Sequence, residues 1–209
     1  MEEVKPIFIV CGCMKYKIYL EAAIRRFTRP TWITVGFIGD MTISEPHKDG
    51  DIVYLPVSDK YEDLPRKIYA AFSWVSSTYP NSPGIYKTDD DIVYNDIQIL
   101  EDEILKNRET PYWGLHTSYC KSANIIQLHK FEDKTLHPTH QTAEYCYGHG
   151  YWINRDSLLF ILNSKKDYDE SYLEDVCTGY VMNSYGIYPV HIPVPYKEIE
   201  RGPELLVAK

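Results

Sequence analysis

The sequence predicts an α/β protein whose central sheet is mixed, mostly parallel and flanked by helices. In the first half of the chain, strand-like apolar segments alternate with amphipathic helical segments, the pattern of a parallel sheet covered on both faces. The second half changes to a mixture of strands followed by helices. No repeat, low-complexity tract or Pro/Gly/Ser-rich linker divides the 209 residues. We therefore expect one domain with a cleft between two halves, about 1–95 and about 96–209.

The first elements are predicted from apolar spacing. Residues 6–12 (PIFIVCG) form a buried-strand candidate, and a helix follows over 17–27 with Leu20, Ile24 and Phe27 on one face. Arg25 and Arg26 end this helix, where cations complement the helix dipole, and a phosphate-binding role is the alternative. Two further strands are expected over 32–39 and 51–56.

The next helix is expected over about 61–78, and Pro65 falls in its first turn, where the missing N–H is tolerated. Its inward side chains recur every three or four residues: Leu64, Ile68, Phe72 and Val75. A strand over 82–87 then leads into an acidic run. Asn95 or Asp96 is placed to cap a third helix. The inward side chains of that helix are Ile97, Leu100 and Ile104.

The second half is predicted from alternation and turn residues. Segments 112–119 and 124–131 resemble a hairpin, and 143–154 is a strand interrupted by glycines. Helices over about 155–163 and 171–185 follow, the second ended by Gly186, before a last short strand over 187–194.

Charge and composition exclude several classes. The net charge of -8 argues against nucleic acid as the main partner, because phosphate backbones are bound by a surplus of Lys and Arg. The acidic N-terminus with its short apolar run resembles neither a signal peptide nor a membrane anchor, and no membrane span is expected. We interpret the five cysteines as free thiols in a reducing compartment. The expected location is therefore cytoplasmic.

The acidic run consists of Asp89, Asp90 and Asp91, directly after the strand at 82–87. Alternation along a strand places Asp89 and Asp91 on one side and Asp90 on the other. Two carboxylates ~5–6 Å apart repel by about 3 kcal/mol at an effective dielectric near 20. A divalent ion reverses that sign, and oxygen-only ligands suit Mn²⁺ or Mg²⁺, whose coordination is completed by water and phosphates. A solvated acidic turn before the next helix is the alternative.

Residues 61–95 resemble the core block of the β1,3-galactosyltransferase/Fringe family of GT-A glycosyltransferases. The Asp triplet is preceded by the other matching positions: Tyr61, Leu64, Lys67, Trp74, Pro80 and Lys87. Segments 144–158 and 173–187 are similar to later family blocks, and 23–32 is weakly similar to an early one. The family's Asn-Leu-Thr is Asp-Leu-Pro at 63–65, and its membrane anchor and cysteine pattern are missing. The resemblance therefore indicates a soluble relative, such as a domain of a larger viral or microbial enzyme.

The resemblance implies a GT-A fold, with a nucleotide-sugar-binding half over about 1–95 and an acceptor-binding half over about 96–209. It implies metal-dependent, inverting transfer of a hexose from a nucleotide-diphosphate sugar, with UDP expected by family likeness, to a hydroxyl of a glycan or glycoprotein acceptor. Asp89, Asp91 and His191 are the expected ligands of Mn²⁺ or Mg²⁺. The expected contacts to the nucleotide sugar are Cys11, Gly12, Lys67, Asp89, Asp90, Gly148 and His149.

An inverting transfer also needs a base for the acceptor hydroxyl, and Asp175 is the expected base, with Glu174 as second candidate. Ser171 and Glu174 also have the spacing of a capping box, which is the structural alternative for this acidic pair. His191 has a structural alternative as a strand histidine. Gly148 and Gly150 fit either a close approach of the donor or a bulge.

Three alternatives remain open at this stage. His137 and His140 have the spacing of a helical metal site, but Pro138 argues against a helix and hence against zinc. A metal-dependent phosphohydrolase or nucleotidyltransferase also uses clustered aspartates. A sugar-binding module without turnover would use the 19 tyrosines as stacking platforms.

Overall fold

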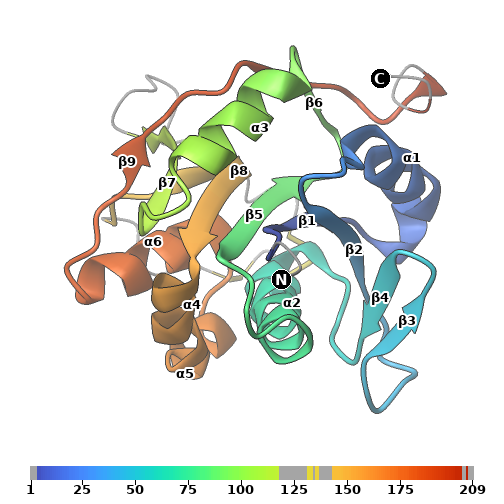
Figure 1. The fold of residues 1–209 in the computed structure, drawn as a ribbon. Helices are drawn as coiled ribbons and strands as arrows, with labels where there is room; N and C mark the ends of the chain where they lie inside the picture. The colour runs from blue at the N-terminus through green and yellow to red at the C-terminus, as the bar shows by residue number, and fades with distance from the viewer. Residues whose placement is uncertain (1–3, 118–130, 134, 137–142, 204–205, 207–209) are drawn as a thin grey trace.

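The computed structural model describes residues 4–117, 131–133, 135–136, 143–203 and 206. In this part of the chain, eight strands form one sheet and two short strands form a separate pair (Figure 1). In spatial order the strands of the sheet are β3 (His47–Asp49), β4 (Ile52–Leu55), β2 (Ile33–Gly39), β1 (Ile7–Cys11), β5 (Gly84–Asp89), β8 (Cys146–Asn154), β7 (Tyr112–His116) and β9 (Val190–His191). The separate pair is β6 (Ile92–Tyr94) and β10 (Tyr196–Glu198).

The helices cover the two faces of this sheet. They are α1 (Lys17–Phe27), α2 (Leu64–Thr78), α3 (Ile97–Lys106), α4 (Arg155–Leu162), α5 (Lys165–Asp169) and α6 (Glu174–Ser184), with 3-10 turns η1 (Met14–Tyr16) and η2 (Tyr61–Asp63). Figure 1 shows α1 and α3 on one side of the sheet and α2, α4, α5 and α6 on the other. None of the helices in the described ranges is long and apolar enough to cross a membrane.

The sheet is mixed and mostly parallel, as the sequence predicts. Strands β4, β2, β1 and β5 run parallel to one another. Strand β8 runs antiparallel between β5 and β7, and β3 is an antiparallel edge strand on β4. The prediction of an α/β protein with a mixed sheet flanked by helices is therefore confirmed.

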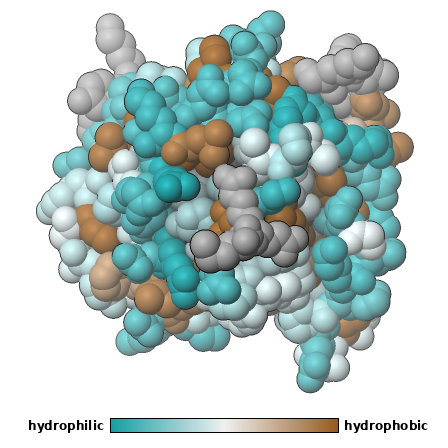
Figure 2. All heavy atoms as spheres, in the orientation of Figure 1, coloured by the Kyte–Doolittle hydropathy of each residue, from teal (hydrophilic) through white to brown (hydrophobic). Residues whose placement is uncertain are grey.

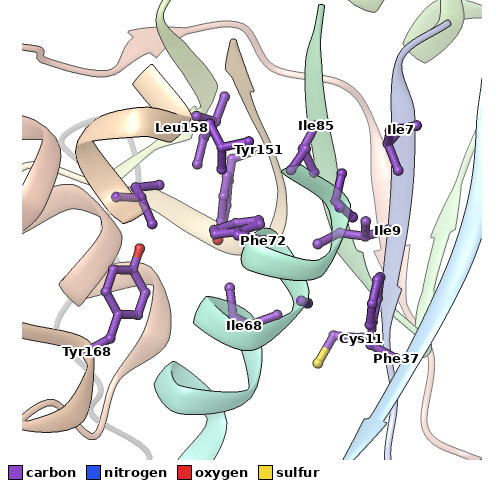
Figure 3. Packing of buried hydrophobic residues seen from close by; sticks show 14 of the residues in the cluster. Ile7, Ile9, Cys11, Phe37, Ile68, Phe72, Ile85, Tyr151, Leu158 and Tyr168 are labelled. Atoms are coloured by element: carbon purple, nitrogen blue, oxygen red, sulfur yellow. The ribbon is translucent and has the colours of Figure 1, made fainter. Parts of the chain in front are cut away.

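Alternation along β1 divides the core into two layers. Ile7 and Ile9 face the layer under α2, while Phe8 and Val10 face the layer under α1. Figure 3 shows Ile68 and Phe72 of α2 packed toward the strand side chains of the first layer. On the outer surface, Figure 2 shows apolar residues scattered among polar ones over the described part of the face, as is usual for a globular protein.

Most predicted elements are confirmed, and the misses are short. The helix over 17–27 has the predicted bounds, and the capping of α3 is confirmed because the Asp96 side chain accepts a bond from the Gln98 N–H. Gly186 follows the last helix with a φ of 75°, as a C-terminal stop requires. Strands β3, β6 and β10 and helix α5 are not predicted by the sequence patterns, and the last strand is shorter than predicted. The partner strand proposed for 124–131 lies almost entirely outside the described residues.

The strand order creates a switch point between β1 and β5. From β1 the chain moves to β2 and β4 on one side, and it then returns to β5 on the other side of β1. Open α/β sheets bind ligands outside the carboxyl ends of strands at such a point. Cys11 and Asp89, the last residues of β1 and β5, are direct partners in the sheet. The acidic run therefore begins at this crevice.

Candidate active site

The three aspartates form the end of β5 and the turn into β6. Asp89 is the last residue of β5, and Asp90 and Asp91 make the turn. The side chains of Asp89 and Asp91 are 30% and 19% exposed, whereas Asp90 is fully buried. This division agrees with the expected alternation, although Asp90 and Asp91 lie in a turn. Two carboxylates thus remain accessible at the switch point.

Asp90 anchors the turn to its surroundings. One carboxylate oxygen lies 2.5 Å from the Arg201 guanidinium, and the backbone N–H donates to the Cys11 carbonyl over 3.1 Å. The other carboxylate oxygen, Oδ2, is buried and has no hydrogen-bond partner in the described part of the chain. The acidic turn therefore holds one unsatisfied buried oxygen as well as its two accessible carboxylates.

Arg26 supports the same turn from α1. Its guanidinium donates to the carbonyls of Asp90, over 3.1 Å, and Ile92, over 2.9 Å. Burial lowers the pKa of Arg26 to about 10. Both bonds use the nitrogen Nη2, so in this structure that part of Arg26 holds the backbone of the acidic turn. Arg25, its neighbour, is exposed.

Lys87 is a buried cation that connects three elements. Its ammonium group lies 2.8 Å from Asp89 Oδ1 and 3.2 Å from Glu174 Oε2, and it donates to the Gly148 carbonyl over 2.6 Å. Burial opposes the charged form of a lysine, but Asp89 and Glu174 outweigh it and raise the pKa of Lys87 well above its ordinary value. Lys87 therefore carries its charge and ties the acidic turn to β8 and α6.

Glu174 is the first residue of α6, and its carboxylate is enclosed. It accepts a hydrogen bond from the Tyr151 hydroxyl and pairs with Lys87. Burial raises the pKa of Glu174 to about 7. The capping-box alternative is wrong, because the Ser171 hydroxyl donates to the Leu173 carbonyl and no side chain caps the helix. The Glu174 carboxylate therefore binds Lys87 and Tyr151 and does not cap the helix.

Asp175, the second residue of α6, is half-buried and faces the same cluster. Its Oδ2 accepts the Gly148 N–H over 3.1 Å, and its Oδ1 accepts the Val176 N–H over 2.9 Å. Burial raises the pKa of Asp175 above its ordinary value. Unlike Glu174, Asp175 keeps part of its surface open. Of the two acidic residues, Asp175 is the more accessible to an incoming hydroxyl.

The glycines of β8 lie in a bulge. Between the pairs Gly114–Tyr151 and His116–Cys146, one residue of β7 lies opposite four residues of β8. The bulge alternative for Gly148 and Gly150 is therefore confirmed. It turns the backbone of Gly148 toward the cluster, where its carbonyl binds Lys87 and its N–H binds Asp175.

The two glycines differ in the room around them. A Cβ at Gly148 would lie 3.4–3.6 Å from the charged atoms of Lys87, Asp175 and Glu174, which is ordinary contact. A Cβ at Gly150 would lie 2.3 Å from the Tyr86 hydroxyl, which no real structure tolerates. Gly150 is required for packing, whereas Gly148 borders the space in front of the carboxylates.

The rings of the two predicted histidines, His149 and His191, have contacts with other groups. His149 Nδ1 lies 2.9 Å from the Tyr196 hydroxyl, and its Nε2 lies 3.6 Å from Glu198 on β10. His191 lies on β9, three strands away from β5, which is ~14 Å at the usual strand spacing. Its Nδ1 accepts the His116 N–H over 3.2 Å. His137 and His140 lie outside the described residues.

The loop after β1 is held by the buried Lys67, which was predicted as a site residue, and by Asp59, which was not. Lys67 donates to the Gly12 carbonyl and to Asp59, each over 2.8 Å. Asp59 also accepts backbone N–H groups from Gly39, at the end of β2, and from Met14. Its position just past a predicted parallel strand was the signal that could have identified it.

Cys11 and Gly12 lie at the switch point, as expected. The Cys11 side chain is buried, and burial raises its thiol pKa to about 12, so the thiol stays neutral. Cys11, Cys13, Cys146 and Cys177 are free thiols, which agrees with the prediction for this part of the chain.

The acidic turn suits a divalent ion that takes few protein ligands. Nowhere in the described ranges do three or more His, Cys, Asp or Glu side chains converge as a metal site. Burial, together with the nearby charge of Asp89, raises the pKa of Asp91 to about 6. Mg²⁺ sites commonly use one or two carboxylates, with water and substrate phosphates completing the shell. Asp89 and Asp91 fit that chemistry.

A separate cavity of about 130 Å³ lies away from this cluster. It is formed at the amino end of β5, opposite the acidic turn, and its lining includes Tyr79, Ser82 and Arg155. The cavity is therefore not part of the candidate site.

Comparison with known proteins gives a match over most of the chain. Residues 25–193 match a family model described as galactosyltransferase. Human beta-1,3-galactosyltransferase 2 is 25% identical over 162 residues, which cover 76% of this chain and 38% of that protein. The pig UDP-GalNAc:beta-1,3-N-acetylgalactosaminyltransferase 1 is 29% identical over 149 residues, which cover 69% of this chain and 44% of that protein. The chain thus spans less than half the length of these relatives.

One solved structure resembles the whole chain in fold. The 4-diphosphocytidyl-2C-methyl-D-erythritol synthase of Anaerococcus prevotii superposes with a TM-score of 0.57 at 12% identity, covering 98% of this chain and 93% of that one. At this identity the likeness concerns the fold alone. It agrees with the mixed, mostly parallel sheet described above.

Proposed function

The chain belongs to the galactosyltransferase family and has the predicted GT-A fold class, and from this premise we propose that it transfers a hexose from a nucleotide-diphosphate sugar to a hydroxyl of a glycan or glycoprotein. Its relatives support a UDP-sugar donor and a hexosyl group, because one is a galactosyltransferase and another a UDP-GalNAc transferase. One observation carries the proposal: two accessible carboxylates, Asp89 and Asp91, lie at the β1–β5 switch point and face a second acidic pair across Lys87. Such a layout has places for a metal-bound diphosphate and for a base.

In this proposal Asp89 and Asp91 hold Mn²⁺ or Mg²⁺. When bound, the ion neutralises the charge that develops on the leaving nucleoside diphosphate. Asp90 keeps the turn in place through Arg201 and the Cys11 carbonyl, and Lys87 fixes the orientation of Asp89. His191 is not included among the ligands, because β8 and β7 separate its strand from β5.

The nucleotide is assigned to the carboxyl end of β1. Gly12 lies there beside Asp89, and its carbonyl is held by Lys67. Because the Lys67 ammonium is buried between Gly12 and Asp59, we assign Lys67 to shaping this loop rather than to direct contact with the donor. The same assignment applies to Asp59.

Inversion requires a base that approaches the sugar opposite the leaving group. We assign this role to Asp175, which is half-buried and whose Oδ2 is oriented by the Gly148 N–H. Glu174 is enclosed by Lys87 and Tyr151, so it orients the cluster instead of reaching the acceptor.

The proposal is tested by thermal stabilisation and by product analysis. UDP, GDP, dTDP and CMP are each added with and without Mn²⁺, and a ligand that binds the native state raises the Tm. We expect UDP to stabilise the protein only with Mn²⁺ and Asp91→Ala to abolish the effect. Transfer to a glycan with inverted anomeric configuration, read by NMR, completes the test. Stabilisation by glycans alone, or release of phosphate without transfer, would instead support a binding module or a hydrolase.

We also infer a reducing compartment, such as the cytoplasm, from the buried free thiols Cys11, Cys146 and Cys177. Fractionation of expressing cells tests this location, and recovery of the protein from the secretory lumen would contradict it.

A further inference from the structure

Arg201, in the segment that follows β10, reaches into the acidic turn. The same guanidinium nitrogen, Nη2, lies 2.5 Å from Asp90 Oδ1 and 3.3 Å from Asp91 Oδ2. The guanidinium also lies over the Tyr16 ring, 4.5 Å from its centroid. Tyr16 ends η1, which follows β1, so Arg201 bridges the two sides of the switch point.

The chain around Arg201 is fixed against the same turn. The Ile199 N–H donates to the Asp91 carbonyl over 2.9 Å, and β10 pairs with β6 directly after the turn. Arg201 is therefore placed by backbone hydrogen bonds of its own segment. It is not a long side chain held by charge alone.

Arg201 retains unused hydrogen-bonding capacity. A guanidinium has five N–H donors, and both carboxylate contacts use the single nitrogen Nη2. In the part of the chain that the structure describes, no hydrogen bond is recorded for its Nε or Nη1. The side chain is 31% exposed, so part of it is open to a ligand. Arginine suits phosphate groups because its planar fork can bind two oxygens at once.

We propose that Arg201 is a donor-binding residue that contacts the diphosphate of the nucleotide sugar while sharing Asp91 with the divalent ion. This inference rests on the function proposed above. It assigns a role in donor binding to a residue that lies outside the segments resembling the family. A cation at Asp91 must share that carboxylate with Arg201, so the arginine weakens binding of the metal alone. The diphosphate is an anion, so the same arginine strengthens binding of the nucleotide.

The proposal predicts effects of opposite sign for one substitution. In Arg201→Gln, the affinity for Mn²⁺ without nucleotide should rise by about threefold or more, because a competing positive charge beside Asp91 is lost. UDP at saturating Mn²⁺ should bind about tenfold more weakly, since a charge-assisted contact to phosphate is lost. If Arg201 only held the acidic turn in place, its loss would weaken the binding of Mn²⁺ and of UDP together.

The experiment measures the two affinities separately. Bound Mn²⁺ is counted by electron paramagnetic resonance without nucleotide, and UDP binding is measured by calorimetry at saturating Mn²⁺. Arg201→Lys keeps the charge and loses the fork, so its Mn²⁺ affinity should stay within about twofold of the wild type while UDP affinity falls about threefold. If Arg201→Gln does not fold, the Arg201→Lys variant still tests the proposal.

Arg108→Gln is the matched control. It removes the same charge from an exposed side chain. Arg108 precedes β7, which runs parallel to β5, so it lies near the amino ends of these strands, whereas the acidic turn lies at the carboxyl end of β5. Neither affinity should change in this variant. Parallel losses in Arg201→Gln, or no change in either affinity, would overturn the role of Arg201 while leaving the transferase proposal intact. A wild type that binds neither Mn²⁺ nor UDP would overturn both.

Discussion

Lys87 and Glu174 form a fully enclosed ion pair, with Nζ and Oε2 3.2 Å apart and side chains 1% and 2% exposed. The same ammonium group lies nearer to Asp89, at 2.8 Å. One buried cation thus serves two carboxylates, one facing the proposed metal and the other on the helix of the proposed base. Burial raises the pKa of Glu174 to about 7 even though the charge of Lys87 opposes the shift.

Lys87→Met is expected to destabilise the fold. It removes the cation from a buried cluster and leaves Glu174 without its charge partner, which costs about 3–5 kcal/mol for pairs of this kind. The free energy of unfolding, measured with urea, checks this. The control is Lys106→Met, which removes an exposed lysine of α3 and should change stability by less than about 0.5 kcal/mol. Equal effects of the two substitutions would contradict the role given to Lys87.

The pH dependence of stability follows from the pKa of Glu174. Burial raises this pKa from 4.5 to about 7 in the native state, so the folded protein holds a proton that the unfolded chain releases. The stabilisation from this group is fully present below about pH 4.5 and is lost as the pH rises through about 7. Relative to Glu174→Gln, the wild type should therefore lose stability between these limits. A difference that stays flat, or rises with pH, would contradict a raised pKa.

The β8 glycines allow folding and catalysis to be separated. In Gly148→Ala the new methyl group makes ordinary contacts, so the unfolding free energy should stay within about 1 kcal/mol of the wild type. The methyl group also enters the space in front of Asp175, so kcat/KM should fall about tenfold or more. Gly150→Ala is the matched comparison, because its methyl group meets the Tyr86 hydroxyl and should destabilise by about 1–3 kcal/mol. Full activity in a stable Gly148→Ala protein would remove this glycine from the site.

Asp175→Asn should lower kcat far more than it lowers donor affinity. Loss of a general base costs about 10²–10⁴ in rate, whereas the carboxylates that hold the proposed metal are unchanged. Single-turnover transfer and UDP calorimetry, measured on the same preparation, separate the two effects. If Glu174→Gln proved the more damaging of the two for kcat with both proteins folded, the base would have to be reassigned to Glu174.

Much of the fold was predictable, because its local patterns agree with its tertiary contacts. Leu20, Ile24 and Phe27 have helical spacing in the sequence and are buried together under the sheet. The position of Asp89 at the end of a parallel strand could also be predicted, since Gly84–Asp89 follows the helix of a β-α-β unit. These features depend on residues close in sequence.

Other features of the site depend on contacts between distant segments. The capping-box interpretation of Glu174 failed because Lys87, on the distant strand β5, pairs with its carboxylate. His191 was expected near the aspartates, but β7 and β8 insert between its strand and β5. Arg201 has no local sequence motif, and only the folded chain brings it to the acidic turn after β5.

The central claim is that Asp89 and Asp91 hold a dication against the diphosphate of a nucleotide sugar. Diffraction from crystals soaked with Mn²⁺ and UDP, recorded at a wavelength where manganese scatters anomalously, tests it most directly. We expect one manganese peak within coordination distance of Asp91, with the diphosphate as its further ligand and Arg201 beside a phosphate oxygen. A manganese peak elsewhere, with ordered UDP that does not approach the acidic turn, would contradict it.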